Sequence, residues 1–246
     1  MLRTTDITRI CSGSHGDPFS VLGPHVTPKD KLSIRAFLPG AAIVQLLDGG
    51  GNLIPGTMTQ RDAAGFYEQT LTAAPKDGYC FQVRWEDGQE SVVEDPYRFG
   101  QVLGDVDVWL LGEGTHLRPY EVLGANPREM DGIAGTSFAV WAPNASRVSV
   151  VGDFNFWDGR RHPMRLRREC GVWEIFLPRV AVGARYKFEI VDSKGHLLPA
   201  RADPYARQGE LRPATASVVA PMPAVIAPSG QRREANALDA PLSIYE

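Results

Sequence analysis

The chain has 246 residues, which is enough for one large domain or two small ones. Its 25 glycines and 19 prolines exceed the usual combined share of ~12 %, and aromatic residues make up 9 %. This composition favours short strands joined by many turns and argues against a helical bundle. The 26 basic and 29 acidic residues give a net charge of -3, so no overall positive field attracts nucleic acid.

The first residues carry charges where a secretory signal needs an apolar segment. Asp6 and two arginines lie within residues 1–9, and no run approaches the ~18 apolar residues of a membrane-spanning helix. The three cysteines, Cys11, Cys80 and Cys170, are widely spaced, which indicates neither a disulfide framework nor a zinc site. We therefore expect a cytoplasmic protein that binds neither membrane nor nucleic acid and has no metal or other cofactor.

Segments of the first half of the chain recur in the same order roughly 100 residues later. Five segments match, at slowly increasing offsets, and this indicates a tandem duplication with small loop insertions. The matching pairs are HxxPFxVLG from His15 with HxxPYxVLG from His116, Ser33–Pro39 with Ser137–Pro143, Tyr67–Glu68 with Trp173–Glu174, Tyr79–Phe81 with Tyr186–Phe188, and Asp95–Tyr97 with Asp203–Tyr205.

Each repeat has the alternation that is typical of half-buried strands. In the second repeat, apolar and polar residues alternate at 148–150, 173–177 and 186–190, and turn-forming residues such as Trp-Asp-Gly at 157–159 separate these segments. Several short strands in a unit of about 100 residues favour an immunoglobulin-like β-sandwich.

The repeats predict an all-β chain with two tandem immunoglobulin-like β-sandwich domains, at residues 1–108 and 109–220. Residues 221–246 are rich in Ala, Pro and Arg and show little alternation, as expected of a linker. The last six residues, 241–246, resemble the start of a strand that the chain does not complete.

Strand positions also assign several large side chains to the core. Trp141 and Trp173 lie in strand patterns, as do their repeat partners Phe37 and Tyr67, so we predict that all four are buried. A basic run follows Trp157, and we predict that it forms a solvated strand edge. Its members are Arg160, Arg161, Arg165, Arg167 and Arg168.

Longer motifs connect the chain to a known family. They are GTSFAVWAPNASRVSVVGDFNFWDG (135–159), RYKFEI (185–190), ADPYA (202–206) and LSIYE (242–246), preceded by HGDPFSVLGPH (15–25) and LGEGTHLRPYEVLG (111–124). In this order they closely resemble the N-terminal region of bacterial 1,4-α-glucan (glycogen) branching enzymes of the α-amylase superfamily.

The resemblance implies a function for each part of the chain. The second sandwich would be a family-48 carbohydrate-binding module, and LSIYE would open a catalytic (β/α)8 barrel. Such a barrel takes about 250 residues, so we expect this chain to lack it, to have no catalytic residue and to be inactive alone. We expect it to bind glycogen or α-1,4-glucan chains and to have the barrel as its partner in cis. The barrel would transfer α-1,4 chains to α-1,6 branch points.

Two other functions stay open at this point. The chain could be a stand-alone module that binds glycogen or a partner protein without any chemistry. It could also be the N-terminal part of a related debranching or trehalose-releasing enzyme. The paired sandwiches and the spacing from Asp203 to the final LSIYE count against this last possibility.

A glucose ring has an apolar C–H face and a hydroxyl rim, so binding it needs an exposed aromatic plate near hydrogen-bond donors. Trp157 lies in a predicted turn, and Lys187 alternates out of phase with Tyr186 and Phe188, which places its ammonium outward. The resemblance implies that Trp157 and Lys187 contact the sugar. The alternative is that Trp157 caps the sandwich and Lys187 is an ordinary solvated lysine.

The first repeat lacks both proposed sugar contacts. The positions that match Trp157 and Lys187 are Leu53 and Cys80, so we predict that the first domain is a structural copy. In addition, the loop at 194–199 has no second tryptophan such as family members with strong affinity carry. We therefore predict weak binding of a short oligosaccharide by the second domain.

Overall fold

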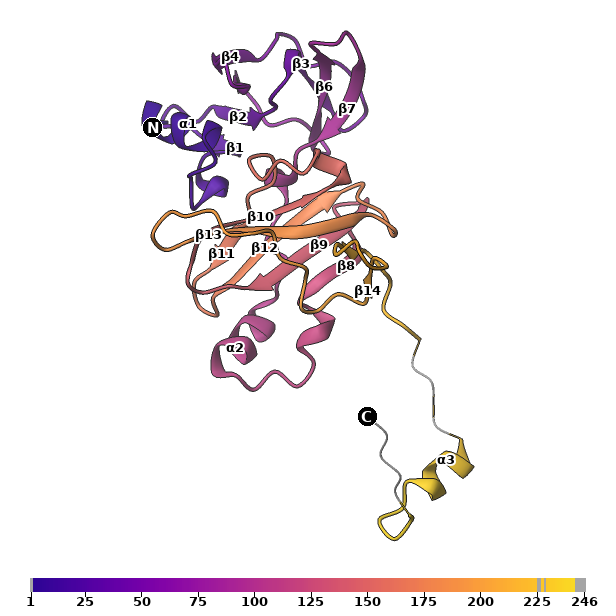
Figure 1. Cartoon of the computed structure of the whole chain (residues 1–246). Helices are drawn as coiled ribbons and strands as arrows, with labels where there is room; N and C mark the ends of the chain where they lie inside the picture. The colour runs from indigo at the N-terminus through magenta and orange to yellow at the C-terminus, as the bar shows by residue number, and fades with distance from the viewer. Residues whose placement is uncertain (1, 225–226, 228, 242–246) are drawn as a thin grey trace.

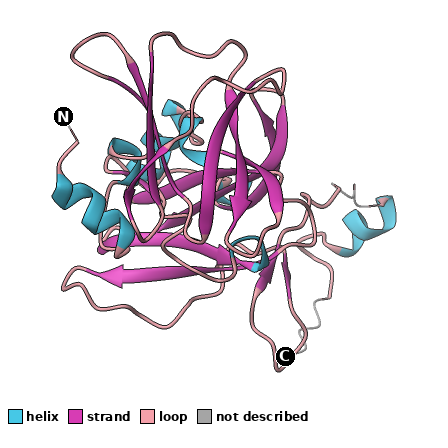
Figure 2. Cartoon of the chain, turned by 90° about the horizontal axis from the view of Figure 1, so that it is seen from above, coloured by secondary structure: helices cyan, strands magenta, loops and turns pink. Residues whose placement is uncertain are grey.

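The computed structural model describes residues 2–224, 227 and 229–241. In that part of the chain, strands predominate and form four sheets in which all pairs of neighbouring strands are antiparallel (Figures 1 and 2). The protein is therefore all-β, as predicted, with a few short helices between the strands.

The first domain is a sandwich of two sheets. One sheet has the order β1-β2-β5-β4 and the other β3-β6-β7. The strands are β1 (Gly23–Val26), β2 (Leu32–Phe37), β3 (Ala41–Asp48), β4 (Thr59–Asp62), β5 (Phe66–Leu71), β6 (Tyr79–Trp85) and β7 (Glu90–Glu94). Alternate residues of the two sheets, such as Ile34 and Tyr67 against Val44 and Phe81, meet in one apolar core.

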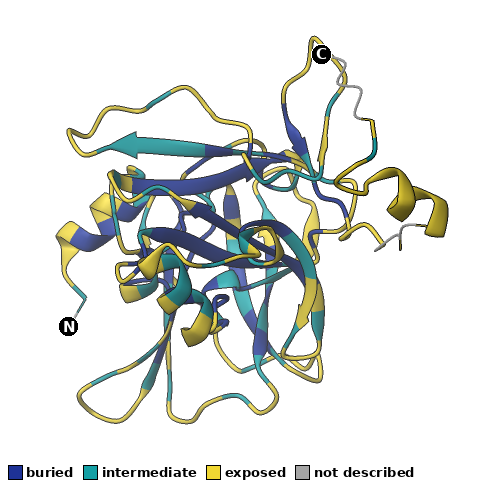
Figure 3. Cartoon of the chain, turned by 90° about the horizontal axis from the view of Figure 1, so that it is seen from below, coloured by how far each residue is buried: buried dark blue, intermediate teal, exposed yellow. Residues whose placement is uncertain are grey.

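The second domain has the same architecture. Its sheets have the orders β11-β12-β9-β8 and β10-β13-β15-β14. The strands are β8 (Gly124–Met130), β9 (Ile133–Trp141), β10 (Ala145–Gly152), β11 (Arg165–Arg167), β12 (Val172–Pro178), β13 (Arg185–Asp192), β14 (Gln208–Gly209) and β15 (Ser217–Val218). Phe138 and Trp173 of one sheet pack with Val150 and Phe188 of the other, and Figure 3 shows buried residues concentrated in the middle of the molecule.

The duplication inferred from the sequence is present in strand register and in side-chain contacts. Cys80 of β6 lies opposite Leu47 of β3, and Lys187 of β13 lies opposite Val151 of β10, at matching repeat positions. A tyrosine hydroxyl donates to the aspartate of the Asp-Pro-Tyr motif in each domain: Tyr79 to Asp95 over 2.6 Å and Tyr186 to Asp203 over 2.5 Å.

Each repeat also begins with a helix that strand periodicity did not predict. These helices are α1 (Thr4–Cys11) and α2 (Asp105–Glu113). Acidic residues lie in the first turn of each, where they interact favourably with the helix dipole, and α2 ends at Gly114 in the left-handed conformation. Four 3₁₀ turns complete the folded part: η1 (Pro18–Ser20), η2 (Pro96–Arg98), η3 (Pro119–Glu121) and η4 (Asp153–Asn155).

The two repeated histidines have a structural role at the end of these helices. The Nδ1 atom of His15 accepts the backbone N–H of Asp17, and that of His116 accepts the backbone N–H of Arg118, each over 3.1 Å. On its other side, the His116 ring lies 3.1 Å from the Asp107 carboxylate of α2. Both histidines therefore fix turns.

Trp141 is a correction to the predicted core. Trp173, Phe37 and Tyr67 are buried as predicted, but Trp141 is 63 % exposed. The residues before it on β9 are apolar on both faces of the strand, so the alternation does not define which face is inside. Phe138 and Val140 point into the sandwich, and Trp141 ends the strand on the outer face. Helix α2 covers only part of that face, through Val108 against Ala139.

The basic run is a second correction, because most of it lies against the first domain or within the second. Arg161 donates to the carbonyl oxygen of Pro39 over 2.9 Å, and the Arg165 guanidinium lies 4.0 Å from the centre of the Phe19 ring. Arg167 is buried and donates to the carbonyl oxygen of Leu103. Only Arg160 and Arg168 are exposed, as expected of a solvated edge.

The two sandwiches share a continuous apolar cluster. Phe37, Phe66 and Tyr97 of the first domain belong to the same cluster as Met164 and Val180 of the second. The Tyr97 hydroxyl also approaches two backbone carbonyl oxygens of the second domain, those of Arg161 and Pro163, at 3.3 Å each. The two domains thus pack firmly against each other, and Figure 1 shows the first above the second.

The last part of the chain leaves the second sandwich. A short exposed helix, α3 (Gly230–Ala235), begins after Ser229, whose side chain accepts the backbone N–H of Arg232. The predicted barrel-entry segment at 242–246 lies outside the described residues. Residues 108 and 220 remain our proposed domain limits, and α2, which spans the first of them, packs on the second sandwich. In the described part of the chain, no helix is long and apolar enough to cross a membrane.

Candidate functional site

Trp157 lies in a tight turn that follows β10. Its backbone N–H donates to the carbonyl oxygen of Gly152, 3.0 Å away, at the end of that strand. The buried amide of Asn155 holds the turn from inside, because it accepts from the N–H of Gly152 and donates to the carbonyl oxygen of Val150, both over 2.9 Å. The turn therefore presents Trp157 at a fixed place, with 40 % of the residue exposed.

The backbone of this turn is strained. Phe156 and Trp157 are consecutive and have φ angles of 58° and 59°, in the left-handed region that glycine adopts freely. A bulky residue rarely adopts this conformation, and two in succession require that the surrounding structure impose it. The strain turns both aromatic side chains outward from the end of the strand.

A carboxylate fixes the orientation of the indole. The Trp157 indole N–H donates to Oδ1 of Asp153 over 3.0 Å, and the Arg185 guanidinium donates to Oδ2 of the same carboxylate over 2.7 Å. The hydrogen bond from Arg185, more than that from Trp157, holds the pKa of Asp153 below its usual value. Asp153 is therefore ionised at neutral pH and keeps accepting both bonds.

Lys187 points to the same side of the second domain. Its neighbours on β13, Tyr186 and Phe188, are buried in the core, so the alternation of the strand directs Lys187 outward as predicted. Its ammonium donates to the Thr215 hydroxyl over 2.7 Å. Arg185 is two residues before Lys187 and shares its face of the strand.

We call this surface the Trp157 face. It comprises Asp153, Trp157, Arg185, Lys187 and Thr215, from the η4 turn, β13 and the segment before β15. It combines one aromatic plate with an ammonium, a guanidinium and a hydroxyl. An apolar plate beside such donors matches the C–H face and the hydroxyl rim of a sugar.

Sequence analysis found two of these five residues. Arg185 had a signal that could have been used, because it lies two residues from Lys187 on the same strand face. Thr215 had none, since only the pairing of β13 with β15, in which Tyr186 lies opposite Ser217, brings its segment to Lys187. Asp153 had no signal either, because its role depends on the turn that brings the Trp157 indole to its carboxylate.

The first domain has no counterpart of this face. Leu53, which matches Trp157, is 52 % exposed and carries no ring. Cys80, which matches Lys187, is a half-buried thiol whose pKa is raised by burial, so it stays neutral at physiological pH. Neither an aromatic plate nor a cation stands at these two positions.

The described residues bring together no group of three or more His, Cys, Asp or Glu side chains that could hold a metal ion. The most deeply buried glutamate, Glu174, has a structural role. One of its oxygens accepts the backbone N–H of Leu103 over 2.8 Å, and the other lies 3.4 Å from the Arg165 guanidinium. It thus connects the interdomain segment to the second sandwich.

Comparison with known protein families matches both domains. Residues 3–97 match the family described as alpha-1,4-glucan branching enzyme GlgB, N-terminal domain. Residues 122–206 match carbohydrate-binding module 48, described as the isoamylase N-terminal domain. The two matches follow each other without overlap and leave the region around α2 between them.

Among solved structures, the chain is similar to pullulanases. It is 19 % identical to a pullulanase from Anoxybacillus sp. LM18-11 complexed with maltotetraose, with 80 % of this chain and 27 % of that one covered and a TM-score of 0.34. It is also 19 % identical to the apo pullulanase from Klebsiella pneumoniae, with 81 % and 24 % covered and a TM-score of 0.34. The aligned part spans about a quarter of these enzymes.

Proposed function

The chain belongs to the N-terminal region of the glycogen branching enzymes of the α-amylase superfamily, and from this premise we propose that its second domain binds α-1,4-glucan chains such as glycogen at the Trp157 face. The match of the first domain to the branching-enzyme family favours this function over that of a debranching enzyme. Within a longer enzyme, the region would hold glycogen near a following catalytic domain that transfers α-1,4 chains to α-1,6 branch points. We expect that enzyme to act in the cytoplasm.

The observation that carries the proposal is the pairing of a fixed, exposed indole with outward cations. Asp153 holds the Trp157 ring and thereby restricts its rotation before a ligand binds, which lowers the entropy cost of stacking. Lys187 and Arg185 lie on the neighbouring strand, where their N–H groups can donate to sugar hydroxyls. The Thr215 hydroxyl already accepts from Lys187 and can in turn donate to a hydroxyl of the ligand.

These contacts make a weak site for a single short oligosaccharide. Stacking one ring on Trp157 hides ~50 Å² of apolar surface, worth about 1 to 1.5 kcal/mol. One hydrogen bond from a charged donor adds ~1.5 to 3 kcal/mol, from which the cost of association is subtracted. We therefore propose millimolar to high-micromolar affinity. Glycogen offers many chain ends, so rebinding strengthens the attachment of the domain to the polymer.

Affinity electrophoresis in gels that contain glycogen tests the proposal. We expect glycogen to retard the wild-type chain, Trp157→Ala and Lys187→Ala each to weaken the affinity about tenfold, and Leu53→Ala to have no effect. Leu53 is the matched control because it is the exposed counterpart of Trp157 in the first domain. Equal mobility of all four proteins in the presence and absence of glycogen would exclude the proposed site.

A further inference from the structure

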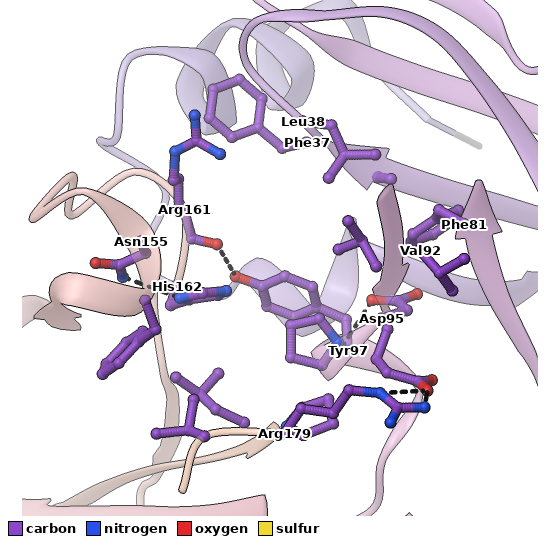
Figure 4. Close-up of a pocket in the computed structure, with 18 of the residues that line it drawn as sticks. Phe37, Leu38, Phe81, Val92, Asp95, Tyr97, Asn155, Arg161, His162 and Arg179 are labelled. Carbon is purple, nitrogen blue, oxygen red and sulfur yellow. Dashed lines mark hydrogen bonds and ion pairs between the residues drawn. The ribbon is translucent and has the colours of Figure 1, made fainter. Parts of the chain in front are cut away.

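A cavity of about 310 Å³ lies where the two domains meet (Figure 4). The first domain contributes Phe37, Phe81, Val92 and Tyr97, among others, and the second contributes side chains from the turn after β10 and from the end of β12. Its walls are mainly apolar and aromatic, with polar groups from both domains, among them Asp95, Asn155 and Arg179. The volume is at the lower end of the ~300–1,000 Å³ range of ligand pockets.

Phe156 connects this cavity to the Trp157 face. Phe156 is 79 % exposed and lines the cavity. The next residue, Trp157, donates a hydrogen bond to Asp153 on the other side of the turn. The Phe156 ring lies 5.2 Å from the Arg161 guanidinium, which also lines the cavity. Phe156 thus presents its ring to the cavity, and Trp157 presents its ring to the Trp157 face.

Backbone strain is concentrated at the same place. Within the described residues, six non-glycine residues have a positive φ, and three of them are aspartates, which tolerate this conformation. The other three are the bulky Phe156, Trp157 and Arg179. All three belong to the Trp157 face or line the cavity. Strain of this kind lowers stability and clusters at functional sites.

The cavity also has hydrogen-bond donors available. The Arg161 guanidinium is already engaged, because it donates from one terminal nitrogen to the carbonyl oxygen of Pro39 and its buried Nε lies 3.9 Å from the Asp158 carboxylate. Arg179 pairs with Glu94 over 2.8 Å, and 69 % of its side chain is exposed. The Arg179 guanidinium is therefore a charged donor at the cavity that a ligand hydroxyl can reach.

We propose that the interdomain cavity is a second α-glucan subsite, which receives one or two glucose rings of a chain whose neighbouring rings stack on Trp157. Phe156 would provide the aromatic plate, and the exposed Arg179 guanidinium would donate to a sugar hydroxyl. The apolar walls fit the C–H faces of neutral sugar rings, and the cavity adjoins the Trp157 face. This inference rests on the proposed function, because it extends the same glucan chain across a single turn.

The experiment measures the affinity of the full chain for maltotriose and maltoheptaose by calorimetry. A short ligand occupies the Trp157 face alone, whereas a long one reaches the cavity. We expect Phe156→Ala to weaken maltoheptaose binding about fivefold and to change maltotriose binding less than about twofold. Val92→Trp fills the cavity from an exposed position on β7, removes no proposed sugar contact, and should have the same selective effect.

Two controls separate the inference from the function on which it rests. Leu53→Ala should bind both ligands like the wild type, and Trp157→Ala should lose affinity for both. If Trp157→Ala weakens binding while Phe156→Ala and Val92→Trp bind maltoheptaose like the wild type, the second subsite is wrong and the proposed function stands. If the wild type binds neither ligand, the proposed function fails, and the subsite fails with it.

Discussion

The two repeats place equivalent residues in opposite surroundings. Phe37 in the first domain and Trp141 in the second are repeat partners on outer strand faces, yet Phe37 is 6 % exposed and Trp141 is 63 % exposed. Phe37 belongs to the apolar cluster shared by the two domains. No described part of the chain covers Trp141 in the same way. A position in a duplicated fold is therefore buried or exposed according to what packs on it.

The same comparison distinguishes the Trp157 face from the matching surface of the first domain, which lacks the proposed sugar contacts. Trp157 and Lys187 of the second domain correspond to Leu53 and Cys80 of the first, at matching positions in the chain. The strand register is preserved, so the difference comes from the side chains and from the turn after β10. Duplication thus kept the scaffold in both copies, and only the second carries the groups that suit a sugar.

The largest expected effect is on stability, and it concerns the repeat partners Phe37 and Trp141. Phe37→Ala should lower the free energy of unfolding by about 3–5 kcal/mol, because it leaves a cavity in the shared core. Trp141→Ala should change it by less than about 1 kcal/mol, because the indole is mainly solvated. Urea denaturation of the two variants measures both values. Equal losses would show that Trp141 has packing that the structure does not describe.

The sequence alone was enough for much of the fold. The repeat motifs and the period-two alternation correctly predicted two sandwiches, the outward direction of Lys187 and the burial of Trp173. They could not show how the domains pack, because that depends on contacts between residues far apart in the chain. For this reason Arg161 and Arg165 were wrongly assigned to a solvated edge. Trp141 was wrongly assigned to the core because β9 has apolar residues on both faces, so the alternation does not define its inner face.

The candidate site was predictable only in part, for a similar reason. Trp157 and Lys187 had recognisable positions in turn and strand patterns. Asp153 matters because the strained turn folds the indole back over it, and Thr215 matters because β15 pairs with β13. The interdomain cavity exists only once both domains are in place, so no local pattern could indicate it.

The buried aspartates of the two Asp-Pro-Tyr motifs, Asp95 and Asp203, make the stability of both domains depend on pH. Burial raises the pKa of Asp95 to about 6, from 3.8 in the unfolded chain, and also raises the pKa of Asp203. The folded state therefore binds more protons than the unfolded state between pH 4 and 6, and the contribution of Asp95 to stability falls as pH rises through this window. By the size of that shift, the fall reaches up to about 3 kcal/mol.

Asp95→Asn removes this titration. The free energy of unfolding of the wild type should therefore exceed that of the variant by less and less as the pH rises from 4 to 7. Asp203→Asn should show the same sign in the second domain. Urea midpoints measured across this pH range give both differences. A difference that stays constant with pH for Asp95→Asn would mean that this carboxyl is already ionised in the folded protein at pH 4.

The most direct test of the central claim, that the second repeat binds α-glucan at the Trp157 face, uses the five tryptophans of the chain as probes. Their indole N–H signals can be followed by NMR while maltoheptaose is added. We predict that the Trp157 signal moves most, and that those of Trp109 and Trp141, which are each 63 % exposed, move little. The largest shift at Trp109 or Trp141, with Trp157 unmoved, would contradict the account.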